Sequence, residues 1–266
     1  MRPFVISIAG FDPSSGAGIT ADCKTIEACR VYALGVCSAI TFQNEDVFEG
    51  VEWVSADAII RQLEILLRKY RVEYCKIGLI ENMEVLQTVT EYLHRCSIRI
   101  VWDPILRAST GFTFHSTSKE IKENTDMLAQ LTSVAATLFL ITPNLQEFDQ
   151  LSSFLGIQDT QQWLGLGIEN VLLKGGHQAG ADCSDFLYQH HEIRRLEGAR
   201  LEGFDKHGTG CVLSAAITAR LALGDDVESA CRFAKQYVEA FIGSSDGLLG
   251  YHEKNFSNTT SQRHEE

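Results

Sequence analysis

The chain has 266 residues, of which 45% are hydrophobic and 22% charged, so it can bury a large core and is not intrinsically disordered. Its 35 acidic and 23 basic residues give a formal net charge of -12, which argues against a whole-surface basic field for nucleic acid. No run reaches the roughly 18 apolar residues of a membrane span. We therefore expect no nucleic-acid partner and no membrane partner.

Apolar strands alternate with helical patterns along the chain, as the following ranges show in chain order. We expect strands at residues 4–9, 32–42, 74–77, 98–102, 138–141 and 171–173, a hairpin at 185–196, and helices at 56–70, 83–95, from about 145, at 211–223 and at 226–241. The strand at 32–42 reads as fully buried. This alternation predicts an α/β fold with a mostly parallel sheet covered by helices on both faces.

The domain organisation and the cellular compartment follow from composition. No linker or charge block divides the chain, so we expect one domain over residues 1–253 and a frayed polar tail at 254–266. The apolar run at 4–9 is too short for a secretory signal. The eight cysteines contain no C-x-x-C pair, which favours reduced thiols in a cytoplasmic protein over a disulfide framework or a zinc site.

Polar and glycine-rich segments fall where the expected parallel strands end. They are residues 10–18, 43–44, 78, 103, 144 and 174–177. Ligands of such sheets bind outside the carboxyl ends of the strands. The recurrence predicts a single site at this edge.

The string His207-Gly-Thr-Gly-Cys211 opens an expected helix. Its glycines let backbone approach a ligand, and the free N–H groups and positive dipole of a helix start suit anionic oxygens. An ordinary glycine-rich turn with Thr209 as helix cap is equally compatible with the bare pattern.

Seven short strings occur in an order that resembles one known family. They are Ala9-Gly-Phe-Asp-Pro-Ser-Ser-Gly-Ala-Gly-Ile-Thr-Ala-Asp22, Gln43-Asn44, Lys76-Ile-Gly78, Asp103-Pro104, Thr142-Pro-Asn-Leu-Gln-Glu147, Lys174-Gly-Gly-His177 and His207-Gly-Thr-Gly-Cys211. The chain resembles the hydroxymethylpyrimidine and phosphomethylpyrimidine kinases of thiamine biosynthesis, in the ribokinase superfamily. The resemblance implies a ribokinase-like three-layer α/β/α sandwich, with ATP and Mg2+ as cofactors.

The reaction that the resemblance implies is phosphoryl transfer from ATP to the hydroxymethyl oxygen of an aminopyrimidine, and in many members to its monophosphate. The catalytic segment would be Gly208, Thr209, Gly210 and Cys211. We expect the helix start to lower the pKa of Cys211, so that its thiolate serves as a modest base. A purely steric guide for the acceptor and a core thiol remain the alternatives, because phosphoryl transfer relies mainly on positioning.

The acceptor pocket that the resemblance implies includes Gln43, whose carboxamide complements an aminopyrimidine edge. The other acceptor positions that match the family are Gly10, Ala17, Asp22, Leu79 and Ile105. Asp22 would accept a hydrogen bond from the amine or hydroxyl. Its alternative role is that of an acidic residue in a first helical turn, and Gln43 alone would read as a strand end.

The nucleotide side of the implied site contains Lys174, Asn144 and Thr209, with the Lys174 ammonium meeting phosphates as a point charge. Glu147 would hold Mg2+ through water, with Asp103 assisting. The alternatives without a function are that Lys174 is a lysine at a strand end whose ammonium reaches solvent, and that Glu147 and Asp103 are solvated carboxylates. The chain departs from the family's usual pattern at 204–206 and after 243.

Three other functions fit parts of the pattern. A pyridoxine or pyridoxal kinase of the same fold is the nearest alternative, and Gln43 and Cys211 favour the aminopyrimidine. Residues 16–21 also fit the dinucleotide pattern G-x-G-x-x-A, but they begin seven residues after the strand end, too late for that turn. A non-catalytic sensor would need no phosphate apparatus. A homodimer is the usual assembly of the family, and we expect one here.

Overall fold

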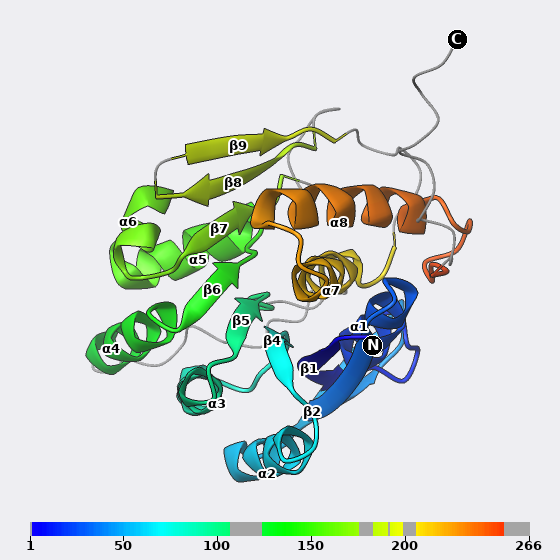
Figure 1. Ribbon diagram of the computed structural model, residues 1–266, viewed down its shortest axis with the longest axis horizontal. Coiled ribbons are helices and arrows are strands. Elements are labelled where there is room, and N and C mark those ends of the chain that lie inside the picture. Colours follow the sequence, from blue (N-terminus) through cyan, green and yellow to red (C-terminus); the bar gives the residue numbers. More distant parts are fainter. Residues whose placement is uncertain (1, 107–123, 176–182, 191, 199–205, 253–266) are drawn as a thin grey trace.

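The computed structural model describes residues 2–106, 124–175, 183–190, 192–198 and 206–252. Within these residues nine strands form one sheet in the order β3-β2-β1-β4-β5-β6-β7-β8-β9 (Figure 1). The parallel strands are β2 (Tyr32–Gln43), β1 (Phe4–Phe11), β4 (Val72–Ile77), β5 (Arg99–Trp102), β6 (Leu138–Ile141) and β7 (Asn170–Leu173). The antiparallel strands at the two edges are β3 (Phe48–Trp53), β8 (Asp185–Gln189) and β9 (Glu192–Leu196).

Helices cover both faces of the sheet, so the expected three-layer α/β/α fold is confirmed (Figure 1). The apolar cluster on one face is formed with α1 (Gly18–Ala28), α7 (Thr209–Ala222) and α8 (Val227–Ile242). The cluster on the other face is formed with α2 (Ala56–Leu67), α3 (Met83–Arg95), α4 (Asn124–Ala135), α5 (Leu145–Leu155) and α6 (Thr160–Gly165).

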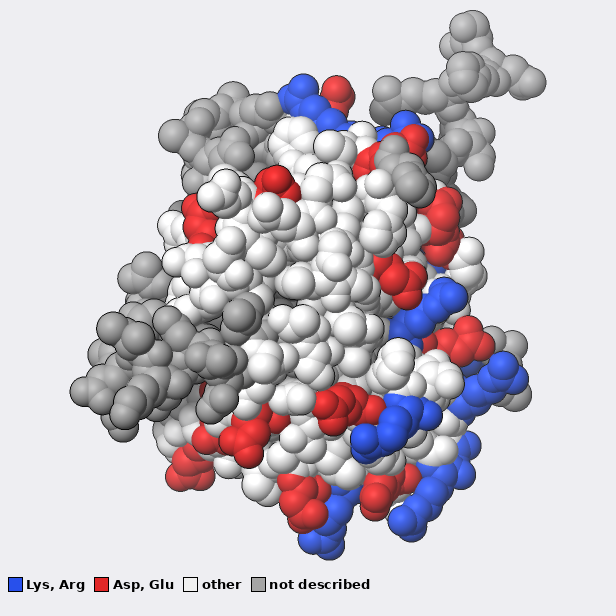
Figure 2. Space-filling model, turned by 90° about the vertical axis from the view of Figure 1, so that its left-hand side faces the viewer, with Lys and Arg blue, Asp and Glu red and all other residues white. Residues whose placement is uncertain are grey.

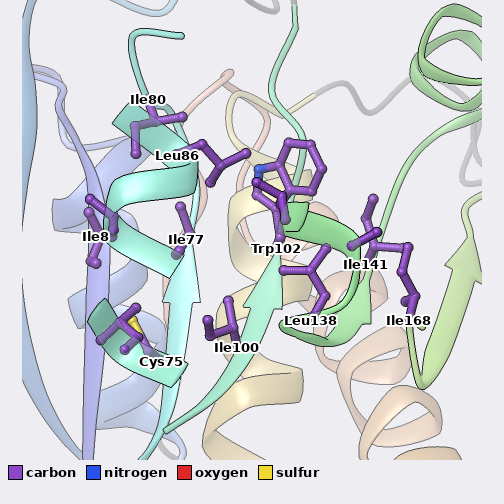
Figure 3. Packing of buried hydrophobic residues seen from close by; sticks show 14 of the residues in the cluster. Ile8, Cys75, Ile77, Ile80, Leu86, Ile100, Trp102, Leu138, Ile141 and Ile168 are labelled. Atoms are coloured by element: carbon purple, nitrogen blue, oxygen red, sulfur yellow. The ribbon is translucent and has the colours of Figure 1, made fainter. Parts of the chain in front are cut away.

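The central strands are apolar on both faces because both faces are covered. In β1, Val5 packs against the α1, α7 and α8 layer, whereas Ile6 and Ile8 pack against the opposite layer. Figure 3 shows the second layer from close by, where Ile8 and Ile77 lie near Leu86 of α3. Alternation along each strand therefore divides the core into two clusters separated by the sheet.

Polar side chains fix several helix starts near the expected positions. Asn82 accepts a hydrogen bond from the backbone of α3, and Ser55 and Asp226 do the same for α2 and α8. The helix expected at 211–223 begins two residues earlier, because Gly208 is its N-cap. The polar tail expected at 254–266 lies outside the described residues.

Some expectations were wrong or incomplete. The strand β2 is not fully buried: its outer half leaves Ile40 and Phe42 exposed at 43% and 47%. It runs beyond the part that pairs with β1 and continues beside the edge strand β3. The elements β3, α1, α4 and α6 were not among those expected from the sequence pattern.

The carboxyl ends of the parallel strands meet at one edge, as expected. Asp103 directly follows β5, Asn144 lies three residues after β6, and Lys174 directly follows β7. An isolated parallel bridge between Asn144 and Lys174 extends the pairing of β6 and β7 to this edge. The topology thus gathers segments that are far apart in the sequence.

The surface carries both signs of charge. On the face in Figure 2, Lys and Arg are interspersed with Asp and Glu, around a central area of uncharged residues. None of the described helices combines the length and the apolar character that spanning a bilayer requires. All eight cysteines are free, and four of them, Cys29, Cys75, Cys211 and Cys231, are buried.

Replacing Ile77 by Ala should destabilise the protein by about 2–5 kcal/mol, because a fully buried side chain in the central sheet leaves a cavity. Urea unfolding followed by circular dichroism measures this free energy. Ile65 on α2 is 64% exposed, so Ile65→Ala is the matched control and should change stability by less than about 0.5 kcal/mol. Equal losses in the two variants would contradict the assigned packing.

Candidate active site

The loop between β1 and α1 is organised by Asp12. Its carboxylate accepts hydrogen bonds from the backbone N–H groups of Ser14 and Ala17, both at 2.9 Å, and from the Ser14 hydroxyl. Gly18 then starts α1 with a φ of +61°, and a Cβ there would collide with the carbonyl oxygen of Gly10. The loop is therefore folded back tightly on the end of β1, as only glycine allows at this position.

The start of α7 lies directly against this opening loop. Gly208 has a φ of +78°, and a Cβ on it would collide with the carbonyl oxygen of Gly16 and approach Ala17 within 3.0 Å. A Cβ on Gly210 would lie 3.5 Å from Lys174 Nζ and 3.7 Å from Asp103 Oδ2. The helix start thus has the loop on one side and a charged cluster on the other.

Cys211 is the third residue of α7 and is 7% exposed. Burial raises the pKa of its thiol to about 11, and the carboxylates of Asp22 and Asp103 add to the effect. The Lys76 ammonium and the Gly18 N–H lower the pKa, but they do not outweigh burial. The expectation that the helix start gives Cys211 a lowered pKa was therefore wrong, and the thiol is protonated at neutral pH.

Lys174 is held between two carboxylates. Its ammonium lies 2.8 Å from Asp103 Oδ1 and 3.9 Å from Glu147 Oε2. Burial alone would lower the pKa of Lys174, but the two carboxylates raise it, so the residue stays charged. Thr142 and Ser214 also donate to Asp103, whose pKa is lowered because the Lys174 and Lys76 ammoniums outweigh its burial.

Asn144 and Glu147 form a capping box at the start of α5. The Asn144 side chain accepts from the Glu147 N–H at 2.9 Å, and Glu147 Oε2 accepts from the Asn144 N–H at 2.8 Å. Each of the two residues therefore holds the other in place at the helix start. Burial raises the pKa of Glu147 to about 7, and Asp103 adds to the effect, whereas Lys174 opposes it.

Asp22 does not lie open to a ligand. Its carboxylate is fully buried, accepts from Ser7 Oγ at 2.6 Å and pairs with Lys76 Nζ at 2.7 and 2.8 Å. A fully buried carboxylate that is bonded to Ser7 and Lys76 has no open side for a ligand, so the expected direct hydrogen bond to the acceptor amine or hydroxyl does not fit this arrangement. The alternative role, that of an acidic residue in a first helical turn, is wrong as well, since Asp22 lies beyond the first turn of α1.

Lys76 is the partner that the sequence analysis left without a role. Burial alone would lower the pKa of Lys76, but the Asp22 carboxylate beside it raises it. Its ammonium lies close to Gly78, where a Cβ would come within 3.0 Å of Nζ. A lysine among the apolar residues at the end of β4 is the sequence signal that could have identified it. Asp12 and His207, whose side chains lie 2.9 Å apart, were likewise expected only as members of their motifs, without a role of their own.

Of the expected acceptor residues, Ala17 caps α1 and Asp22 lies within it. The others, Gly10, Gln43, Leu79 and Ile105, lie at or just after the ends of β1, β2, β4 and β5. A Cβ on Gly10 would lie 2.9 Å from a methyl carbon of Leu79, and one on Gly78 would lie 3.6 Å from Ile105 Cδ1. Gln43 ends β2, is half-buried, and its side chain makes no hydrogen bond to a described residue. No described contact joins Gln43 to the α7 start. Gly176 and His177 lie outside the described residues.

The described residues contain no group of three or more His, Cys, Asp or Glu side chains arranged around one metal position. Two described acidic residues, Asp103 after β5 and Glu147 in the first turn of α5, lie on either side of Lys174. Each carboxylate is already bonded to the protein. Of the acidic residues that the structure describes, Asp103 and Glu147 are the two beside Lys174 that could serve a cation there.

Two solved structures share this architecture. A pyridoxal kinase of Bacillus subtilis, solved as an ADP complex, aligns with a TM-score of 0.78 and 27% identity, covering 93% of this chain and 94% of that chain. A phosphomethylpyrimidine kinase of Clostridium difficile aligns with a TM-score of 0.73 and 28% identity, covering 90% and 99%. The fold, together with its glycine-rich helix start beside a lysine, is that of a small-molecule kinase.

The sequence comparisons narrow this class to one family. The family model described as phosphomethylpyrimidine kinase matches residues 12–254. A hydroxymethylpyrimidine/phosphomethylpyrimidine kinase of Rhizobium meliloti (strain 1021) is 34% identical over 262 residues, covering 93% of each protein. The chain belongs to the phosphomethylpyrimidine kinase family, and the resemblance found in the motifs is confirmed.

The raised pKa of Glu147 predicts a pH effect on stability. Its folded pKa of about 7 exceeds the ordinary 4.5, so its contribution is present below pH 4.5 and is lost as the pH rises to about 7. Glu147→Gln keeps the capping oxygen and cannot ionise. Between these pH values the variant should therefore gain stability relative to the unmodified protein, by about 1.4 kcal/mol per unit of pKa shift at most.

Urea unfolding at a series of pH values measures this difference. Asp149→Asn, at an exposed acid on the same helix, is the matched control. The control should show no comparable pH-dependent gain. A difference between Glu147→Gln and the unmodified protein that stays constant across the range would contradict the raised pKa.

Proposed function

We propose that this protein transfers the γ-phosphoryl group of ATP to the hydroxymethyl oxygen of 4-amino-5-hydroxymethyl-2-methylpyrimidine, and then to the monophosphate, in thiamine diphosphate biosynthesis. Membership of the phosphomethylpyrimidine kinase family supports this function. The observation that carries it is the packing of the Gly208 turn against the opening loop, with Lys174 beside Gly210. A phosphate at the helix start would thereby meet an acceptor held by the loop.

The nucleotide phosphates would bind at the start of α7. Backbone N–H groups of Gly208, Thr209 and Gly210 lie at the positive end of a 14-residue helix, which favours anionic oxygens. Lys174, whose side chain is 14% exposed, adds a charged ammonium at this place. Asn144, whose backbone bridges to Lys174, would contribute on the nucleotide side. Electrostatic stabilisation of this kind is the main catalytic resource in phosphoryl transfer.

The residues fit a magnesium ion, which is typically bound by one or two carboxylates, waters and the substrate phosphates. Glu147 is the better candidate, because its Oε1 has no hydrogen bond to a described residue. Asp103 is 2% exposed, and donors from Lys174, Thr142 and Ser214 occupy it. We assign Asp103 the role of holding Lys174. Magnesium would supply charge neutralisation at the phosphates.

The acceptor would lie between the opening loop and the ends of β2 and β4. The carboxamide of Gln43, which bonds no described residue, can hydrogen-bond a ring nitrogen and its exocyclic amine. Gly10 and Leu79, in close contact, and Ile105 would provide apolar walls for the ring, and Ala17 a small surface in the loop. Asp22 would act from behind the pocket, by fixing Lys76 beneath Gly78.

Cys211 would guide the acceptor rather than remove its proton. A thiol with a pKa of about 11 supplies little thiolate at neutral pH. The loose transition state of phosphoryl transfer requires little base assistance, since the acceptor proton is lost late. This choice keeps the steric role that the sequence left open.

Pyridoxal phosphorylation is the second candidate, because a solved neighbour of 27% identity is a pyridoxal kinase. An ADP-release assay with the purified protein, ATP, magnesium and each alcohol separates the two. We expect ADP release with the hydroxymethylpyrimidine. Release with pyridoxal alone would overturn the aminopyrimidine assignment, and release with neither would overturn the kinase proposal.

Replacing Gln43 by Leu should weaken acceptor binding and leave ATP binding unchanged. The polar edge of the ring would lose its partners, which corresponds to about 1–3 kcal/mol. Calorimetric titration with the pyrimidine, and separately with a non-hydrolysable ATP analogue, measures both affinities. Gln161→Leu on the exposed surface of α6 is the control. A similar loss of both affinities in Gln43→Leu would count against the assigned role.

Replacing Cys211 by Ser should leave the shape of the pH–rate profile unchanged between about pH 6 and pH 9, because the thiol is protonated there. Loss of a general base would lower kcat by about 10²–10⁴-fold, and we expect a far smaller change. Steady-state kinetics across this pH range checks the prediction. A fall of that size, steepest at high pH, would restore the base mechanism.

We further propose a homodimer that acts in the cytoplasm, with the aminopyrimidine and ATP as its small-molecule partners. The dimer is the assembly that the family resemblance implied. Size-exclusion chromatography with light scattering measures the mass of the assembly. A monomer at working concentration would refute this part and leave the kinase assignment untouched.

A further inference from the structure

A buried contact between a histidine and a carboxylate joins the opening loop to the start of α7. His207 Nε2 lies 2.9 Å from Asp12 Oδ2, and the two side chains are 4% and 0% exposed. The neighbours of this pair along the chain are the phosphate-binding turn at 208–210 on one side and the acceptor loop at 13–18 on the other. The pair is therefore the direct side-chain link between two halves of the site that are 195 residues apart in sequence.

The geometry determines which atom donates. Burial would raise the pKa of Asp12, but its hydrogen bonds, that from His207 above all, outweigh this and lower it, so the group is a carboxylate that only accepts. Nε2 is therefore the donor. Nδ1 of the same ring is buried and has no hydrogen-bond partner among the described residues. The orientation of the imidazole thus depends on the single bond to Asp12.

Asp12 holds the loop and the histidine at the same time. Its Oδ1 accepts from the backbone N–H of Ser14, and its Oδ2 accepts from the Ala17 N–H and from His207. A Cβ on Gly16 would lie 2.7 Å from His207 Cδ2, so the ring packs directly under the loop. A shift of the histidine would therefore displace the loop residues that face the acceptor.

The turn is held from its other side by the segment at 245–249. The His207 N–H donates to the carbonyl oxygen of Leu248 at 2.9 Å, and Lys206 Nζ donates to the carbonyl oxygens of Ser245 and Gly247. Since these contacts fix the backbone of residue 207, the side-chain bond to Asp12 transmits that fixed position to the loop. Gly16 and Gly208, which are in contact, are both buried, so the loop and the turn meet there away from the surface.

We propose that Asp12 and His207 are a positioning pair that clamps the acceptor loop onto the phosphate-binding turn and keeps water away from the transferring phosphoryl group. The proposal rests on the kinase function above. In the productive reaction the bond from phosphorus to the β,γ-bridging oxygen breaks, a bond to the alcohol oxygen forms, and the alcohol proton goes to solvent. When the clamp loosens, water replaces the alcohol, and ATP gives ADP and inorganic phosphate.

The test compares His207→Leu with His207→Gln, whose amide N–H can replace Nε2–H as a donor to Asp12. In His207→Leu we expect kcat for alcohol phosphorylation to fall by about 10- to 100-fold, with ADP released in excess over the phosphorylated alcohol. The KM values should change much less, because each half of the site remains. His207→Gln should release ADP and phosphorylated alcohol in equal amounts, as the unmodified enzyme does.

Asp12→Asn is an independent variant. An amide has one acceptor oxygen where the carboxylate has two, so it cannot satisfy both Ser14 and the Ala17–His207 pair. It should therefore also release excess ADP, and combination with His207→Leu should add little, since both changes break the same link. If His207→Leu does not fold, this variant carries the test.

Ser152→Ala is the matched control, because it removes a buried 2.8 Å hydrogen bond to Trp163 on the other face of the sheet. It should keep equal amounts of the two products. Calorimetric titration with AMP-PCP counts binding-competent sites, so kcat is expressed per competent site in every variant. A merely structural role for the pair would reduce that count without changing the ratio of ADP to phosphorylated alcohol.

Equal product amounts and an unchanged kcat in His207→Leu and Asp12→Asn would overturn the inference, as would excess ADP in His207→Gln. Those results would leave the proposed function standing if the unmodified enzyme phosphorylates the pyrimidine. If it phosphorylates pyridoxal instead, the acceptor assignment fails and the same ratio is measured with pyridoxal. If it phosphorylates neither alcohol, both the function and the inference that rests on it fail.

Discussion

The close approach of α7 to the sheet is the constraint on which the site depends. Ala215, Ala216 and Ala219 are fully buried, so the helix presents small side chains where it packs. Its start consequently reaches the carboxyl edge of the sheet, where Gly208 touches the opening loop. Larger side chains on this face would move the helix away, and the backbone N–H groups would no longer lie beside both Lys174 and the loop.

Buried charges surround this helix start in compensated groups. Lys76 pairs with Asp22, and Lys174 lies between Asp103 and Glu147. Buried ion pairs contribute little net stability, because desolvation of both ions offsets their attraction. Their effect here is geometric: each ammonium is held at a fixed place behind or beside the glycine turn. Burial above all, with the nearby carboxylates adding to it, raises the pKa of Cys211 and keeps its thiol protonated.

Local sequence signals predicted much of the fold because many helices and strands have a regular apolar pattern and capping residues of their own. The helix at 83–95 was predicted with its observed bounds, since its apolar stripe is regular and Asn82 caps it. The strand at 138–141 was likewise predicted with its observed bounds. In contrast, β3 is an edge strand without a buried residue, and α1 begins with a glycine after a glycine-rich loop, so neither has a distinctive pattern.

The sequence by itself determined where polar segments follow the parallel strands, which family the chain resembles, and which residues are candidates for the site. Motif spacing and apolar periodicity, from which these were predicted, are properties of the chain alone. Only the tertiary structure decided what those residues face. In the folded protein Asp22 pairs with Lys76, Asp103 pairs with Lys174, and the pKa of Cys211 is raised. Burial and the distance between charges set these properties, and both arise only when segments far apart in the chain are packed together.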